Sequence, residues 1–285
     1  MIHNLLAGGM IMNDTLKNEK IAKKMILLQE ELKKFGKVMI AFSGGVDSTF
    51  LLKAAQLALE NRVTAVTARS GLIPERDLAE AEDFCKQQGI RHIYYDFDEF
   101  AIDGFAENLV NRCYICKKAL FSNLLDIAEK NNSVLCEGSN LDDLNDYRPG
   151  LKALAELNVQ SPLRAVCLTK AEIRLLSDEL NLPTWNKPSF ACLASRFAYG
   201  EQITTVKLEI VDKAEQLLWD LGFKQFRVRV HGNLARIELL QEELPQLFAE
   251  SKHRFIYEKL HELGFSYVTV DLLGYRTGSM NENLS

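Results

Sequence analysis

The residues most suited to chemistry in this sequence lie between Ser43 and Ser48 and read SGGVDS. A short apolar run precedes them and a helical pattern follows, so the predicted order is strand, glycine turn and helix start. Adjacent glycines let a ligand approach the backbone closely, and the first N–H groups of the helix point toward the turn. These properties predict an anion site, most naturally for phosphate, although two glycines alone also fit an ordinary tight turn.

A C-x-x-C pair, Cys113 and Cys116, is the second chemical feature. Two thiolates fall short of the four ligands of a structural zinc site, and the sequence has no second pair. Cys192 is the third candidate, because its loop is expected at the carboxyl-end side of the sheet. Three cysteines fit a [4Fe-4S] cluster that leaves one iron open, and the alternative is a set of incidental thiols. The remaining cysteines are expected to be packing residues: Cys85, Cys136 and Cys167.

The elements that position these residues alternate between strand and helix patterns. The expected strands are residues 38–42, 63–68, 93–97 and 134–138, and the expected helices are residues 18–34, 49–60, 74–88 and 116–131. This alternation predicts an α/β fold with a doubly wound parallel sheet. Farther along, residues 162–163 resemble a short strand, and Thr169 with Glu172 forms a capping box that predicts a helix start.

Ligands of open parallel sheets bind at the carboxyl ends of the strands, so Thr67, Ala68 and Ser70 should border the ligand of the glycine turn, at its adenosine if that ligand is a nucleotide. The fourth strand leads into a polar stretch, residues 137–150, that is rich in Asn and Asp. This stretch is either a solvated turn or a site that binds Mg²⁺ through oxygen ligands and ATP through Arg148. We favour the second interpretation, because a loop of this length in a compact fold usually has a function.

The chain has 285 residues, of which 47% are hydrophobic, and a formal net charge of −5. We expect a flexible leader (residues 1–16), a nucleotide-binding domain (17–200) and a smaller α+β domain (201–285). The sequence shows no apolar run near the roughly 20 residues that span a bilayer, no basic start of a secretory signal and no cationic block. We therefore expect a cytoplasmic enzyme of small molecules with no membrane or nucleic-acid partner.

The carboxyl-terminal part predicts a hairpin in which residues 226–231 and 234–239 are joined by a Gly-Asn turn. Strand alternation places Arg227, Arg229 and His231 on one face, with Glu238 on the partner strand. These residues form either a solvated face or, as we favour, a site for an anionic substrate or a subunit contact. The arginine face and the strand edges make a homo-oligomer the expected state.

The SGGVDS segment resembles the signature of the PP-loop ATP pyrophosphatases and lacks the lysine of the other common phosphate loop. The resemblance implies a fold like that of the adenine nucleotide alpha hydrolases and cleavage of ATP between its α and β phosphates. It implies that Asp47 helps to position Mg²⁺. It also implies a set of ATP-binding residues: Ala41, Ser43, Gly44, Gly45, Asp47, Ser48 and Gly138.

Five segments together resemble the LarE family over nearly the whole chain: SGGVDST, EGSNLDDLNDYRPG, WNKPSFACLASRFAYG, FRVRVHGNLARIEL and YVTVDLLGYRTGSMN. This resemblance implies an enzyme that uses ATP and Mg²⁺ to adenylate a carboxylate of pyridinium-3,5-biscarboxylic acid mononucleotide. Oxygen is then replaced by sulfur, in synthesis of the nickel-pincer cofactor of lactate racemase. Matching positions imply that Ser195 and Arg196 bind the substrate phosphate and that Lys117 acts on the adenylate. Four further residues would lie near the substrate or a neighbouring subunit: Arg227, Arg229, Glu215 and Glu238.

Members of this family differ in their sulfur source. One branch sacrifices the sulfur of its own cysteine, and ungapped alignment puts that donor at Ala191, beside Cys192. That branch lacks the C-x-x-C, so Cys113 and Cys116 imply the branch in which a [4Fe-4S] cluster, held also by Cys192, presents an added sulfide. Sacrificial donation from Cys192 is the alternative.

Two other functions are weighed against this one. A PP-loop tRNA thiolase can share the phosphate turn and a three-cysteine cluster, but such enzymes usually carry further zinc-binding pairs and basic surfaces. An ATP-sensing module without chemistry would not need Asp47, the polar loop or three cysteines.

Overall fold

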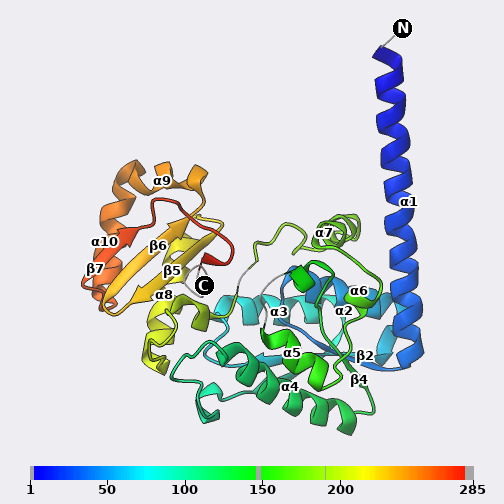
Figure 1. Ribbon diagram of the computed structural model, residues 1–285, viewed down its shortest axis with the longest axis horizontal. Helices are drawn as coiled ribbons and strands as arrows, with labels where there is room; N and C mark the ends of the chain where they lie inside the picture. Colours follow the sequence, from blue (N-terminus) through cyan, green and yellow to red (C-terminus); the bar gives the residue numbers. More distant parts are fainter. Residues whose placement is uncertain (1–2, 146–148, 190, 280–285) are drawn as a thin grey trace. The chain divides into compact units, whose positions relative to one another are not determined.

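The computed structural model describes residues 3–145, 149–189 and 191–279 (Figure 1). By its internal contacts the chain divides into two compact units. Unit 1 comprises Met1–Ala68, Asp77–Tyr95 and Lys117–Ser189, and unit 2 comprises Arg69–Arg76, Asp96–Cys116 and Phe190–Ser285. This division differs from the domains expected from the sequence, because two early segments group with the carboxyl-terminal part and the later boundary follows residue 189 rather than residue 200.

Among the described residues, the first sheet has four parallel strands in the order β3-β2-β1-β4. Its strands are β1 (Val38–Ala41), β2 (Val63–Arg69), β3 (Arg91–Asp96) and β4 (Val134–Cys136). The helices of this part are α1 (His3–Phe35), α2 (Val46–Leu59), α3 (Glu75–Gln88), α4 (Arg112–Lys130), α5 (Pro149–Glu156), α6 (Pro162–Ala165) and α7 (Lys170–Glu179).

Helices cover both faces of this sheet. Val38 and Ile40 belong to a core formed with α1, α2, α3 and α7, whereas Met39 belongs to a core formed with α4 and α5. Burial on both faces explains why β1 and β2 are almost continuously apolar, as is usual for strands of a parallel sheet. The predicted doubly wound α/β fold is confirmed.

Three local expectations were wrong. The helix α1 begins at His3, so residues 3–16 continue the helix expected from residue 18; no proline interrupts this stretch. Residues 162–163 open the short helix α6, with Pro162 at its first position, where proline is favoured. The helix α4 begins at Arg112 rather than Cys116, which places both cysteines of the C-x-x-C in its first turns.

Unit 2 contains a smaller mixed sheet with the order β5-β6-β7 in the described residues. Its elements are α8 (Thr205–Asp220), β5 (Phe226–His231), β6 (Leu234–Leu239), α9 (Leu244–Phe248), α10 (Lys252–Glu262) and β7 (Tyr267–Val270). The strands β5 and β6 are antiparallel with Arg227 opposite Glu238, and β7 runs parallel to β6. Phe226, Val228 and Val230 face the core formed with α8 and α10.

The helix α2 offers a matched test of this packing, because Leu51 is fully buried and Leu57 is 48% exposed. Leu51→Ala should lower the free energy of unfolding by about 2–5 kcal/mol, since it removes buried methyl groups and leaves a cavity. Leu57→Ala should change it by less than about 0.5 kcal/mol. Urea unfolding followed by circular dichroism measures both values, and equal losses in the two variants would contradict the placement of α2.

Candidate functional site

The SGGVDS turn joins β1, which ends at Ala41, to the start of α2. Gly44 has a φ of +68°, a left-handed conformation that favours glycine, and a Cβ there would lie 3.3 Å from the carbonyl oxygen of Asp77. Gly45 caps α2 without a side-chain hydrogen bond, so no side chain closes the amino terminus of that helix. The turn therefore presents uncapped N–H groups and the positive end of the helix dipole, which suits an anion.

Two hydroxyl groups hold the turn in shape. The Ser48 hydroxyl accepts from the backbone N–H of Ser43 at 3.3 Å, lies 3.1 Å from Ser43 Oγ and donates to the Gly45 carbonyl at 3.2 Å. Gly138 packs against the same turn, since a Cβ there would lie 3.1 Å from the Ser48 nitrogen. The structure thus brings together the residues predicted around the phosphate turn.

Asp47 is paired with a lysine that the sequence reasoning missed. Lys170 Nζ lies 2.5 Å from Asp47 Oδ2, and Asn140 Nδ2 donates to Asp47 Oδ1 at 3.3 Å. Lys170 is the first residue of α7, directly after its cap Thr169. A cation is disfavoured at the positive end of a helix, so a lysine there was the available sign of an anionic partner.

A second lysine reaches the same turn from the loop that contains WNKPSF. Lys187 Nζ donates to the Gly44 carbonyl at 3.3 Å and pairs with Asp77 at 3.0 Å and Glu80 at 2.6 Å. Its side chain is 12% exposed. Lys187 therefore ties that loop to the turn and to α3.

Several side-chain oxygens of the polar loop after β4 accept hydrogen bonds from the same loop. Glu137 is buried and accepts from the Ser139 N–H at 2.9 Å and the Ser139 hydroxyl at 2.7 Å, and Asp143 accepts from the Asn140 N–H at 2.9 Å. These contacts are those of a structured turn, and the link to the phosphate turn runs through Asn140 and Asp47. Arg148, the residue expected to hold ATP, lies outside the described residues.

The other residues predicted to border the nucleotide do not all belong to the same unit. Thr67 and Ala68 are buried at the end of β2 in unit 1, where Thr67 Oγ1 donates to the Phe42 carbonyl at 2.8 Å and lies 2.8 Å from His92 Nε2. Burial lowers the pKa of His92, which keeps the ring neutral. Ser70 belongs to unit 2, and its hydroxyl accepts from the Leu72 N–H.

Lys117 follows the C-x-x-C in α4 and belongs to unit 1. Its stem packs so closely on Gly150 that a Cβ on Gly150 would lie 2.5 Å from Lys117 Cδ. A side chain at position 150 would therefore displace the Lys117 stem. The action of Lys117 on an adenylate stays a prediction.

The three candidate cysteines all belong to unit 2. Burial raises the pKa of Cys116 to about 12, and the charges of Cys192 and Cys113 add to that rise. Cys192 is exposed as a residue, but desolvation around its sulfur raises the pKa of the thiol, against the opposing effect of Arg112 and Arg196. The thiols are therefore close enough to influence one another, and three thiols suit an iron-sulfur cluster in donor type. No three His, Cys, Asp or Glu side chains of the described residues are already arranged to hold a metal ion.

The other cysteines behave differently from one another. Cys85 and Cys136 are buried in the core, as expected of packing residues. Cys167 is exposed, so the packing interpretation was wrong for this residue. It has a φ of 55° at the turn after α6, which directs the chain out of the apolar stretch that precedes it.

On the expected face of β5, Arg227 and Arg229 are buried rather than solvated, whereas His231 is exposed. A third arginine, Arg196, is also buried. Arg196 has a fully buried side chain that forms a two-pronged ion pair with Glu215, at 2.8 Å and 2.7 Å. Its remaining nitrogen, Nη1, donates to the Ala191 carbonyl at 2.7 Å, the Cys192 carbonyl at 3.2 Å and Ser195 Oγ at 2.8 Å. The polar atoms of Arg196 are thus all engaged within the protein.

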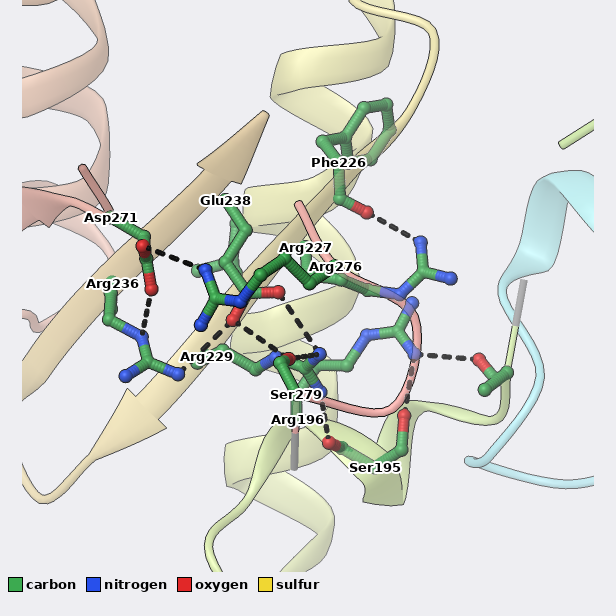
Figure 2. Close-up of polar contacts among 12 residues, drawn as sticks. Ser195, Arg196, Phe226, Arg227, Arg229, Arg236, Glu238, Asp271, Arg276 and Ser279 are labelled. Atoms are coloured by element: carbon green, nitrogen blue, oxygen red, sulfur yellow. Dashed lines mark hydrogen bonds and ion pairs between the residues drawn. The ribbon is translucent and has the colours of Figure 1, made fainter. Parts of the chain in front are cut away.

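Arg229 and Arg227 lie on the same face of β5, as strand alternation predicted. Arg229 donates to the Ser195 carbonyl at 2.6 Å, to Glu238 at 3.0 Å and to the Ser279 hydroxyl at 3.0 Å (Figure 2). The Arg227 guanidinium lies 5.0 Å from the centre of the Tyr275 ring. Burial and the charge of Arg196 lower the pKa of Arg227 to about 10. The carboxyl-terminal segment therefore supplies contacts to both arginines, a feature that the sequence did not indicate.

Known proteins resemble this chain over most of its length. Residues 20–188 match the family model described as NAD synthase. The chain is 38% identical to the pyridinium-3,5-bisthiocarboxylic acid mononucleotide synthase of Lactiplantibacillus plantarum, over 93% of this chain and 96% of that protein. The chain belongs to the LarE family. An uncharacterised protein of Synechocystis sp. is 41% identical over 93% of this chain and 99% of its own length.

A more distant relative of this LarE-family protein is a glutamine-hydrolysing GMP synthase of Dehalococcoides mccartyi. It is 28% identical over 64% of this chain and 38% of its own length. No helix in the described part of the chain is both long enough and apolar enough to cross a membrane.

Limited alkylation tests the environment of the thiols. With iodoacetamide at pH 8, Cys167 should be labelled well before Cys116, since a pKa of about 12 leaves about one Cys116 thiol in 10⁴ as the reactive thiolate. Cys85 is the matched control, because burial alone raises its pKa to about 12. Mass spectrometry of peptides measures the rates, and labelling of Cys116 as fast as Cys167 in folded protein would contradict the burial of the Cys116 thiol.

Proposed function

We propose that this protein is an ATP-dependent sulfur transferase of nickel-pincer cofactor synthesis. Its substrate is a pyridinium dicarboxylate mononucleotide, and its product is the corresponding thiocarboxylate. The observation that carries the proposal is the phosphate turn with an uncapped helix start and a charged pair, Asp47 and Lys170, beside it. The relative from Lactiplantibacillus plantarum, named for the bisthiocarboxylic acid mononucleotide, supports the substrate class.

The first step is adenylation. A carboxylate oxygen of the substrate attacks the α-phosphorus of ATP, the bond between that phosphorus and the bridging oxygen breaks, and pyrophosphate leaves. The turn binds the departing phosphates through backbone N–H groups, and Asp47 contributes a carboxylate oxygen to Mg²⁺, an ion that prefers such ligands. Lys170 then adds a fixed positive charge near the departing phosphates, which stabilises charge as it develops.

The second step is substitution at the activated carbonyl. A sulfur nucleophile attacks the carbonyl carbon, and AMP leaves with one of the original carboxylate oxygens. Adenylation is needed because an oxide is a poor leaving group, whereas the phosphate of AMP leaves readily. Arg227 and Arg229 are buried cations suited to the phosphate of the mononucleotide, which at Arg229 would take the place of the Ser279 hydroxyl. Because Arg196 is fully engaged by Glu215 and the Cys192 segment, we assign it to positioning rather than to phosphate binding.

The sulfur source has two candidates. A [4Fe-4S] cluster held by Cys113, Cys116 and Cys192 would supply an added sulfide from its open iron. The three thiols support this assignment by number and by their mutual influence on pKa. The second candidate is Cys192 itself, which would lose its sulfur by β-elimination.

Lys170→Met tests the adenylation step. The loss of a fixed charge at the departing phosphates should slow pyrophosphate release from ATP and the dicarboxylate nucleotide by about 10²-fold. Lys118→Met is the matched control, because Lys118 is 46% exposed and pairs with Glu156 on the surface. A coupled pyrophosphate assay measures both rates. Equal rates for Lys170→Met and the unchanged protein would remove Lys170 from the mechanism.

The sulfur source is tested on anaerobically reconstituted protein. Cys113→Ser should abolish both the iron-sulfur absorption and thiocarboxylate formation if the cluster is the source. If Cys192 is sacrificed, the same variant should stay active for one turnover, and mass spectrometry should find the chain lighter by one hydrogen sulfide at residue 192. Full cluster absorption in Cys113→Ser would contradict the cluster assignment.

A further inference from the structure

The start of α4 contains a buried arginine for which the proposed function has so far assigned no role. Arg112 is 2% exposed. Its Nη1 donates to the Ala194 carbonyl at 2.8 Å and to Asn108 Oδ1, and its Nη2 contacts Cys113 Sγ at 3.4 Å. One guanidinium therefore touches the C-x-x-C helix and the η4 turn (Leu193–Arg196) that follows Cys192, and all of these residues belong to unit 2.

Within the described part of the chain, no carboxylate pairs with Arg112, whose partners there are a carbonyl, an amide oxygen and a thiol. Arg196, which is also buried, pairs with Glu215. A buried charge is costly unless an opposite charge or several hydrogen bonds compensate it. Hydrogen bonds to the Ala194 carbonyl, the Asn108 amide oxygen and the Cys113 sulfur compensate the buried charge of Arg112.

Asn108 extends the same contact along the chain. It has a φ of 53° and no exposed surface, and its Nδ2 donates to the Ala198 carbonyl at 2.7 Å. Its own carbonyl accepts from the Gly200 N–H at 3.0 Å. Arg112 and Asn108 thus contact Ala194, Ala198 and Gly200, while Arg196, within the same segment, holds the carbonyls of Ala191 and Cys192.

We propose that Arg112 is a positioning residue that ties the start of α4 to the Cys192 segment, so that Cys113, Cys116 and Cys192 are presented together. Arginine suits this task because its planar fork reaches partners in several directions at once, whereas lysine offers a single charged point. The expected effect on sulfur transfer rests on the proposed function. The claim that Arg112 holds the start of α4 to the Cys192 segment does not depend on it.

A cross-linker that joins two cysteine thiols tests whether Arg112 holds Cys113 close to Cys192, and it needs no enzymatic turnover. The cluster-free full chain is treated anaerobically with dibromobimane, and peptide mapping measures two products, Cys113–Cys192 and Cys113–Cys116. In the unchanged protein both products should form. Arg112→Lys and Arg112→Gln should lower the ratio of Cys113–Cys192 to Cys113–Cys116 at least fivefold, because the second pair stays on one helix whatever residue 112 is.

Arg69→Gln is the matched control, since Arg69 is exposed and pairs with Asp96, and it should leave the ratio unchanged. Urea unfolding confirms that each variant is folded. An unchanged ratio in either folded Arg112 variant overturns the proposal. Absence of the Cys113–Cys192 product from the unchanged protein also overturns it. This second measurement decides the proposal if neither variant folds. An unchanged protein that gives this product but transfers no sulfur would contradict the proposed function and leave the role of Arg112 standing.

Discussion

The ion pair between Arg196 and Glu215 determines where the Cys192 segment lies. Both side chains are fully buried, and Glu215 also accepts from the Val228 N–H at 3.0 Å, so the pair joins the η4 turn, α8 and β5. The attraction of Arg196 lowers the pKa of Glu215 even though burial opposes ionisation. Loss of one partner would leave an uncompensated buried charge, which costs about 3–5 kcal/mol. The carbonyls of Ala191 and Cys192 are held by the same guanidinium, so the position of the thiol depends on this pair.

The carboxyl-terminal segment adds a second layer to the same region. Ser279 contacts Arg229 and lies 3.4 Å from Glu238 (Figure 2). The Tyr275 N–H donates to the Leu239 carbonyl at 2.7 Å. Gly274 makes this path possible, because a Cβ there would lie 2.5 Å from the Leu239 carbonyl oxygen. An anion that reaches Arg229 must therefore share or replace the contact that Ser279 makes.

The phosphate turn in unit 1 works on a different physical basis. The anion binding that we propose for it rests on backbone N–H groups and the dipole of α2, and the charged groups around it are in ion pairs. Asp47 is paired with Lys170, and Lys187 with Asp77 and Glu80. These ion pairs stabilise the turn without a ligand, and a nucleotide with Mg²⁺ would exchange partners with Asp47 and Lys170, which are only partly buried.

The sequence by itself determined the features that depend on local periodicity. Alternating strand and helix patterns predicted the parallel sheet, the SGGVDS turn predicted its anion site, and strand alternation placed Arg227 and Arg229 on one face. Only the tertiary structure decided which partner each charged side chain contacts. Lys170 lies 123 residues from Asp47, and Arg112 lies 82 residues from Ala194. Such pairs depend on how the chain is folded back on itself, and hydrophobic periodicity carries no information about them. Burial of the arginines was hidden for the same reason, because the segments that cover them are distant in sequence.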